Sequence, residues 1–282
     1  MSRVALLGTG LLGSGFADGM IARGDTELTV WNRTRAKAQL FAATGARVAE
    51  TPAEAVKGAD RVHLVLLDDA TVDATIRAMR PGLDARTVII DHTTNSPVRT
   101  AERARTLAAG GLAYLHAPVF MSPAAARGGQ GMMMVAGSLE LFEQVKEALA
   151  PMTGDLWYVG ERPDLAAAYK LFGNAMILIV AGGLADVFHM ADALDVPRAD
   201  AFSLFRRFRI EGGLNVRGAK IVEENYSASF RLETARKDAR LMLEAAAGLP
   251  LPLLGALAAR MDEMIAKGFG DLDMAVMAKP GV

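Results

Sequence analysis

The sequence predicts an α/β protein in which a doubly wound parallel sheet is followed by an all-helical part. Short apolar strands alternate with helical segments up to about residue 160, which is typical of a parallel sheet covered by helices on both faces. A glycine-rich turn joins the first strand to the first helix. Beyond residue 160, helical periodicity continues without a strand signal. We therefore expect a nucleotide-binding domain over residues 1–160 and a helical domain over residues 161–282.

The composition excludes several classes of function. A net charge of -1 leaves no basic excess to hold nucleic acid. Cysteine is absent and the 4 histidines are scattered, so we expect neither disulfides nor a metal site. The longest apolar run, at residues 175–185, is shorter than the roughly 20 residues that cross a bilayer. We expect a cytoplasmic protein without membrane contact.

The first strand ends in the pattern G-x-G-x-x-G and a helix follows at once, as in the dinucleotide-binding turn of a Rossmann domain. Gly8 permits the tight turn, Gly10 lets a pyrophosphate approach the backbone, and Gly13 lets the helix pack closely on the strand. The helix N-terminus at Leu11 and Leu12 then offers free N–H groups to the phosphates.

The second strand, residues 27–31, ends in Asn32, Arg33 and Thr34. A site selective for NAD usually carries Asp or Glu at this place, to bind the ribose 2′-hydroxyl. Here Arg33 can instead pair with a 2′-phosphate, and Asn32 and Thr34 can donate hydrogen bonds to it. The sequence therefore favours NADPH over NADH.

The next elements extend the sheet. Thr51 to Glu54 forms a capping box, and residues 61–67 form an apolar central strand that contains His63, which we interpret as a packed core residue. Asp68 follows as a helix cap. Because ligands bind beyond the carboxyl ends of such strands, we expect the backbone of Leu67 and Asp68 to line the cofactor.

A further strand, residues 87–91, leads into a polar loop that opens a helix running to about residue 109. A loop of this kind, which contains Thr94, suits an anion or the nicotinamide carboxamide. The loop over residues 117–131 is too long for a plain connector, so we expect it to be functional. Strands at 132–136 and 155–159 and a helix at 138–149 complete the first domain.

One long helix is predicted over residues 163–194, and it carries Lys170 and Asn174 on one face. Their apolar surroundings place them in a cleft, although a solvated surface lysine is the alternative. Four further helices are expected, at residues 198–209, 214–224, 232–247 and 252–266, before a short tail at residues 274–282. Their apolar faces exceed the needs of one small bundle, so we expect a homodimer.

Taken together, these motifs resemble the β-hydroxyacid dehydrogenase family, which includes 3-hydroxyisobutyrate dehydrogenase and glyoxylate/succinic semialdehyde reductase. The resemblance spans essentially the whole chain. It rests on the glycines that lead to residues 32–34, a substrate motif at residues 91–97, a loop motif at residues 116–122, Lys170 with Asn174, and Lys237-Asp238 preceded by Phe230.

The resemblance implies an NADP(H)-dependent oxidoreductase with a C-terminal domain like that of 6-phosphogluconate dehydrogenase. Lys170 would act as general acid in reduction and general base in oxidation, and Asn174 would orient the lysine or the substrate oxygen. Lys237 and Asp238 would close over the cofactor. The implied substrate contacts are Thr93, Phe120, Met121, Ser122, Lys170, Asn174, Phe230 and Asp238.

The loop motif departs from the family pattern. Phe120, Met121 and Ser122 stand where the family has Ser-Gly-Gly, which grips a substrate carboxylate, and His116 replaces an Asp. One hypothesis is a larger or less polar carbonyl substrate, with Ser122 or Thr93 supplying a hydroxyl. The alternative is that Met121 merely repacks the loop and the backbone amides still bind a carboxylate.

Two other functions stay open. An imine reductase has the same architecture but usually carries Asp or Tyr in place of the lysine. Tyr169 adjoins Lys170, yet adjacent helical residues point about 100° apart. A non-catalytic NADPH-binding module that works through a dimer surface is the second alternative. A lack of NADPH turnover with many carbonyl compounds would support it.

Overall fold

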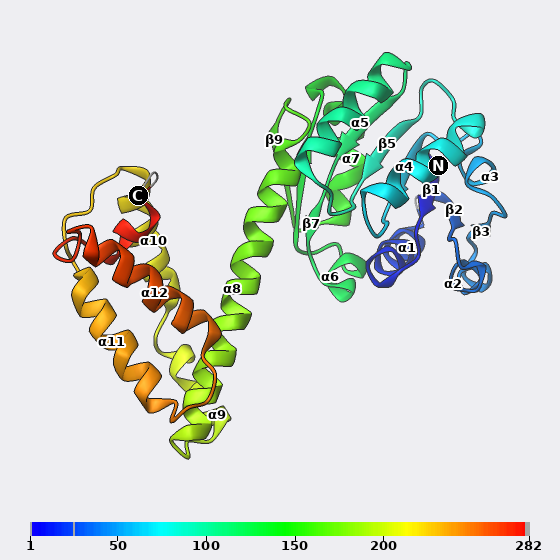
Figure 1. The fold of residues 1–282 in the computed structure, drawn as a ribbon. Coiled ribbons are helices and arrows are strands. Elements are labelled where there is room, and N and C mark those ends of the chain that lie inside the picture. Colours follow the sequence, from blue (N-terminus) through cyan, green and yellow to red (C-terminus); the bar gives the residue numbers. More distant parts are fainter. Residues whose placement is uncertain (1, 25, 280–282) are drawn as a thin grey trace. The chain divides into compact units, whose positions relative to one another are not determined.

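The computed structural model describes residues 2–24 and 26–279 (Figure 1). It divides into two compact units, residues 1–174 and 175–282, and the division falls inside one long helix, α8 (Leu165–Ala193). We keep the domain boundary at residue 160 as a prediction, because α8 contributes to both units. Each unit is described separately.

The first unit is built on a single nine-stranded sheet with the order β3-β2-β1-β4-β5-β6-β8-β7, in which β9 also pairs with β8. Its strands are β1 (Ser2–Leu7), β2 (Thr26–Trp31), β3 (Arg47–Val48), β4 (Arg61–Leu64), β5 (Val88–Asp91), β6 (Ala113–His116), β7 (Val119–Phe120), β8 (Met132–Ala136) and β9 (Asp155–Gly160).

The sheet is mixed, whereas the sequence predicted a parallel one. The strands from β3 to β6 are parallel to their neighbours, but β8 runs antiparallel to both β6 and β7. The two-residue strand β7 and the short helix α6 (Pro123–Arg127) fill the loop that was expected over residues 117–131. That loop lets the chain reverse and enter β8 in the opposite direction.

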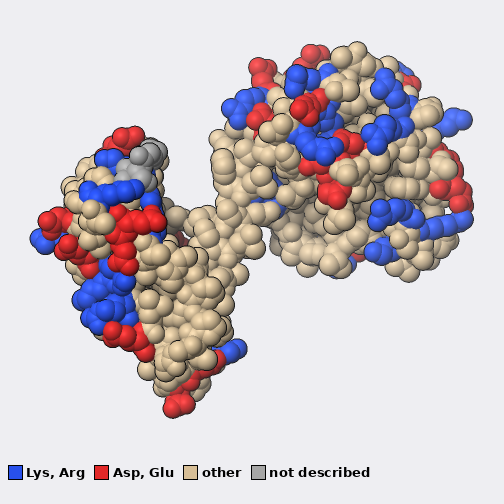
Figure 2. Space-filling model, in the orientation of Figure 1, with Lys and Arg blue, Asp and Glu red and all other residues tan. Residues whose placement is uncertain are grey.

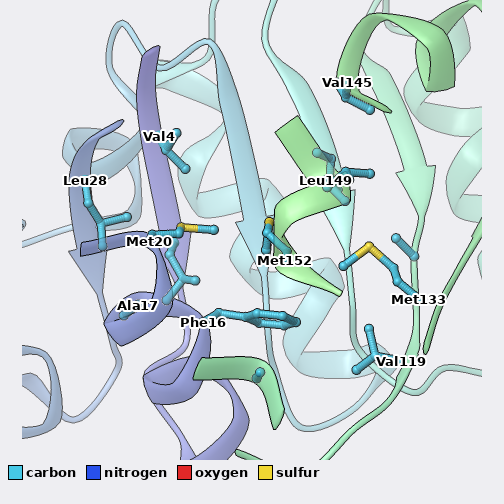
Figure 3. Close-up of a cluster of buried hydrophobic side chains, with 14 of the residues drawn as sticks. Val4, Phe16, Ala17, Met20, Leu28, Val119, Met133, Val145, Leu149 and Met152 are labelled. Atoms are coloured by element: carbon cyan, nitrogen blue, oxygen red, sulfur yellow. The ribbon is translucent and has the colours of Figure 1, made fainter. Parts of the chain in front are cut away.

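Helices cover both faces of the sheet, as predicted. They are α1 (Leu11–Arg23), α2 (Arg35–Gln39), α3 (Pro52–Val56), α4 (Asp69–Met79), α5 (Pro97–Ala109), α6 and α7 (Leu139–Leu149). Alternate residues of β1 supply two separate cores: Val4 and Leu6 pack with α1 and α7, while Ala5 and Leu7 pack with α3, α4 and α5. Figure 3 shows the first core, where Phe16 and Met20 of α1 lie against the strands.

Two predicted caps are confirmed. The Thr51 side chain accepts a hydrogen bond from Glu54 N, and Asp68 accepts one from Thr71 N. Asp68 therefore begins α4 as a cap. The pKa of its carboxyl is lowered, first by the hydrogen bond from the Thr71 side chain.

The second unit is helical. After α8 it contains α9 (Arg198–Ser203), α10 (Ile210–Val222), α11 (Leu232–Ala245) and α12 (Pro252–Ala266). The helix expected over 198–209 is shorter because the chain tightens into a 3₁₀ turn at Leu204–Arg206. The expected tail also forms a 3₁₀ helix, Met274–Ala278, which is capped by Asp273 and buries Val276 in the core of this unit. Residues 280–282 of the tail lie outside the described residues.

Helix α8 is unusually apolar and exposed. No charged residue occurs from 171 to 185, and Phe172, Ile177 and Leu178 are 64%, 58% and 72% exposed. Figure 2 shows this stretch as a surface nearly free of acidic and basic side chains. By length and composition alone α8 could cross a membrane, and among the described helices it alone meets that test. The sequence expectation that the apolar run at 175–185 is too short to cross a bilayer was therefore wrong for α8 as a whole. Asn174 and the glycines do not interrupt the helix, so its apolar stretch is longer than that run.

Candidate active site

The glycine-rich turn between β1 and α1 forms a cradle that side chains would fill. Gly8 has a φ of 104°, and a Cβ atom there would lie 2.1 Å from Val65 O. A Cβ atom on Gly13 would lie 1.9 Å from Gly8 O, whereas one on Gly10 would meet nothing within 4 Å. No side chain caps α1 at Gly10, so its first N–H groups can bind an external anion.

A cavity of about 790 Å³ lies beside this turn. Seven of the predicted cofactor residues line it: Gly8, Gly10, Asn32, Arg33, Thr34, Leu67 and Asp68. Leu11, Leu12, Gly13 and Thr94 are absent from its lining. Leu11 is nevertheless 84% exposed at the start of α1, and Thr94 is exposed in its own loop.

Two basic side chains, Arg33 and Lys37, line the cavity. Arg33 is exposed, and in the described residues neither Arg33 nor Lys37 has an ion-pair partner, whereas Arg35 pairs with Glu50. We did not predict Lys37 from the sequence, although it lies only four residues after Arg33, on α2.

Asn32 has a structural task that the sequence did not indicate. Its Oδ1 accepts a hydrogen bond from Thr9 N at 3.0 Å, and its Nδ2 donates to Thr34 O at 2.9 Å. The side chain thus braces the glycine turn against the end of β2. One N–H and one acceptor site of its amide remain for a ligand.

The loop after β5 is tied down by Asp91, which is fully buried. Its carboxylate accepts hydrogen bonds from Thr93 N, Asn95 Nδ2 and Tyr114 OH at 2.8–2.9 Å. The Thr93 hydroxyl in turn accepts one from Leu66 N at 3.0 Å. Thr93 is 2% exposed and therefore joins this loop to the cavity wall.

Three buried histidines support the same loops. His116 Nε2 donates to Thr93 O at 2.9 Å, and His92 Nδ1 donates to Ala117 O at 2.7 Å. Burial lowers the pKa of His63 and of His116, and it lowers that of His92 to about 4. All three are therefore neutral at pH 7. His63 is a packed core residue, as predicted.

Lys170 and Asn174 share one face of α8, and both are partly buried. The Lys170 Nζ atom lies 3.8 Å from the centre of the Phe120 ring, and burial lowers the pKa of Lys170. Phe120 and Met121 are partly buried, while Ser122 is exposed and its hydroxyl accepts from Ala125 N to cap α6. The structure thus brings Phe120 and Lys170 together.

Phe230, Lys237 and Asp238 belong to the second unit. Lys237 Nζ pairs with Asp238 Oδ1 at 2.8 Å on α11. The ring of Phe230 packs on the core of that unit, and its N–H donates to Asp273. In the described part of the chain, His, Asp and Glu side chains form no group of three or more that could hold a metal ion.

This chain is similar to several known proteins. The model of the NAD-binding domain of 6-phosphogluconate dehydrogenase matches residues 3–160. An uncharacterized oxidoreductase of Bacillus subtilis, YfjR, is 29% identical over 98% of this chain and 99% of its own length. Glyoxylate/succinic semialdehyde reductase 2 of Arabidopsis thaliana is 25% identical over 95% of this chain and 75% of its own.

Human cytokine-like nuclear factor N-PAC is 26% identical over 86% of this chain, which spans 44% of that protein. Among solved structures, a reductive aminase from Aspergillus terreus has a TM-score of 0.91 at 21% identity, with 100% of both chains covered. An imine reductase from Myxococcus stipitatus has a TM-score of 0.88 at 21% identity over 99% of both chains. These two likenesses show the fold: a Rossmann-like domain, a long helix and a helical domain.

Proposed function

The chain belongs to the 6-phosphogluconate dehydrogenase and β-hydroxyacid dehydrogenase family of NAD(P)-dependent oxidoreductases, and on this premise we propose that it is an NADPH-dependent carbonyl reductase. Hydride passes between the nicotinamide and the carbonyl or hydroxyl carbon of a β-hydroxyacid, a semialdehyde or a related less polar carbonyl compound. Lys170 carries the proposal, because it is a partly buried amine that makes no ion pair within the described part of the first unit.

The first unit fits a dinucleotide phosphate. Gly8 and Gly13 stand where any side chain would collide with backbone, and Gly10 leaves the approach to the α1 N-terminus open. Arg33 and Lys37 supply positive charge for a 2′-phosphate. When bound, the reduced nicotinamide supplies the hydride.

Lys170 supplies the proton. In reduction its ammonium donates to the carbonyl oxygen as negative charge develops there, and in oxidation its amine takes the hydroxyl proton. Burial disfavours the charged form, which makes the proton easier to release than that of a solvated lysine. Asn174, one turn along the same face, holds the substrate oxygen or the amine by a hydrogen bond.

The packing of Tyr169 argues against it as an alternative acid. Its ring packs between Trp157 and Phe172, with ring centres at 5.4 and 6.1 Å, and it belongs to an apolar cluster. This packing supports carbonyl reduction by Lys170 over imine reduction by a tyrosine.

We also propose that a second copy of this chain covers the apolar face of α8, so that the active protein is a homodimer in the cytoplasm. Leu241, Met242 and Leu257 of the second unit are also 47%, 37% and 38% exposed. Surfaces of this kind mark interfaces more often than free solvent-facing patches.

The test follows NADPH oxidation with semialdehydes, α-keto acids, apolar aldehydes and cyclic imines. We expect carbonyl compounds to react, and Lys170→Ala to lose at least about a hundredfold in kcat with unchanged NADPH affinity by fluorescence titration. Turnover of imines alone, or full activity of Lys170→Ala, would overturn the proposal. If the protein binds NADPH but reduces none of these compounds, it is instead the non-catalytic NADPH-binding module.

A further inference from the structure

The contact between Phe120 and α8 depends on one glycine. A Cβ atom on Gly173 would lie 2.2 Å from the Phe120 Cζ atom and within 3.0 Å of both Cε atoms. Any side chain at residue 173 would therefore displace the ring. Glycine is unfavourable inside a helix, so the close approach of the ring costs some helix stability at this position.

The ring is held firmly from its own side. Phe120 pairs with Met132 in the β7–β8 ladder, and its side chain packs in a cluster with Met134, Val159 and Leu165. Gly131 fixes the same corner, because a Cβ atom there would lie 2.6 Å from the Met121 Cβ atom. Phe120 is thus a fixed part of the sheet edge and not a mobile loop residue.

The same ring is the partner of the Lys170 ammonium. Nζ stands 3.8 Å from the ring centre, which is the geometry of a cation–π contact. Within the described residues of the first unit, Lys170 forms no ion pair or hydrogen bond, and no charged neighbour contributes to its pKa. The Phe120 ring is therefore the contact that the structure gives this ammonium.

The ring also affects which group of a substrate is favourable beside the Lys170 ammonium. The face of an aromatic ring carries partial negative charge, and the cluster around it is apolar. A carboxylate placed there would lose water and meet no donor from Phe120. Its only charged partner would be the Lys170 ammonium, which the proposed reaction needs at the carbonyl oxygen. An uncharged alkyl or aryl group would gain apolar contact at the same place.

We propose that Phe120, seated on Gly173, is the residue that positions Lys170 and selects carbonyl substrates that lack a carboxylate. The selection of substrates, the substrate half of this inference, rests on the proposed function. The contact that places Lys170, the positioning half, concerns Lys170 alone and holds for the protein without substrate.

The positioning half is tested by NMR of lysines methylated with ¹³C, a modification that keeps the charge. The Lys170 signal is assigned by its loss in Lys170→Arg. Phe120→Leu keeps an apolar side chain but removes the ring, so the charged amine loses its partner. We expect the pKa of Lys170 to fall by about half a unit. Phe172→Leu is the matched control, because that exposed ring lies on the same helix, and it should leave the pKa unchanged.

The substrate half uses butanal and succinic semialdehyde, which share an aldehyde and differ by the carboxylate. We expect kcat/KM to favour butanal by about tenfold or more. Phe120→Ser should reduce this ratio by about tenfold, and Phe120→Leu should keep the ratio but lower kcat for both aldehydes.

The two proposals fail in different ways. A preference for succinic semialdehyde, or a ratio unmoved by Phe120→Ser, overturns the substrate half while carbonyl reduction stands. A Lys170 pKa that is equal in Phe120→Leu and the unmodified protein overturns the positioning half. If no aldehyde is reduced and the Lys170 pKa still falls in Phe120→Leu, the proposed function is wrong and the contact is real.

Discussion

His63 Nδ1 lies 2.9 Å from His92 Nε2, and the two rings stack with their centres 5.2 Å apart. Because His92 Nδ1 donates to Ala117 O, the Nε2 atom of neutral His92 is free to accept from His63. The pair joins β4 to the loop after β5 through an uncharged hydrogen-bonded chain inside the first unit. Protonation of His92 would place an uncompensated charge there.

The first unit should lose stability in mild acid. The pKa of His92 is about 4 in the folded protein and 6.5 for an ordinary histidine, so the unfolded chain binds the proton first as the pH falls. The stabilisation is complete above pH 6.5 and decreases as the pH falls toward 4. Between pH 7 and 5 we expect His92 to account for a loss of roughly 2 kcal/mol in the free energy of unfolding.

Urea unfolding at pH 7 and 5 measures this loss through fluorescence, since both tryptophans, Trp31 and Trp157, lie in the first unit. His92→Phe should lose its share of the pH dependence. His189→Asn, a change in the second unit, should keep it. An equal pH dependence in His92→Phe and the unmodified protein would refute the assignment.

Substitution of Gly13 should lower stability, whereas substitution of Gly10 should weaken NADPH binding. Gly13→Ala brings a methyl group against Gly8 O, so we expect a loss of about 1–3 kcal/mol in the free energy of unfolding. Gly10→Ala meets no atom of the protein within 4 Å, so it should unfold like the unmodified chain but bind NADPH about tenfold or more weakly. Urea unfolding and fluorescence titration separate the two effects. Normal NADPH affinity in Gly10→Ala would place the cofactor elsewhere.

Arg33 and Lys37 should set the preference for the phosphorylated cofactor. Removal of one charge-assisted contact costs about 1.5–3 kcal/mol, so Arg33→Ala should weaken NADPH binding by tenfold or more and leave NADH binding nearly unchanged. Arg35→Ala is the control, because Arg35 pairs with Glu50. If both cofactors weaken equally, Arg33 does not read the 2′-phosphate. Calorimetric titration of both cofactors decides.

Charge on the apolar face of α8 should prevent dimer formation. Leu178→Glu places a carboxylate at a side chain that is 72% exposed, so the helix itself should tolerate it, while a buried interface would not. Light scattering after size exclusion should report a monomer for this variant and a dimer for the unmodified chain. Flotation of the unmodified chain with lipid vesicles, without a dimer in solution, would assign the face to a membrane.

The sequence predicted the fold class because most elements carry their own signal. Strand signals marked β1, β2, β4 and β5, and the periodicity of residues 252–266 gave the bounds of α12. The direction of β8 could not be predicted, since it depends on pairing with β7, a strand of two residues without periodicity. Antiparallel and parallel strands of that length look alike in sequence.

Some features of the candidate site could likewise be predicted from the sequence and others could not. The glycines and the basic turn after β2 were visible because a local motif fixes their spacing. The brace from Asn32 to Thr9 and the contact of Phe120 with Lys170 join segments that are 23 and 50 residues apart. No local pattern encodes such contacts. The contact of Phe120 with Lys170 also depends on a third position, because it requires glycine at residue 173.

Because Phe120 fits tightly on Gly173, we expect these two positions to change together in related chains. A relative that gains a side chain at residue 173 must also give up the ring at residue 120, whereas a relative that loses the ring is free to refill the helix. Glycine three residues after the lysine, together with an aromatic residue at position 120, is therefore a two-letter signature. It can be searched for in genomes to find chains with the same capped lysine.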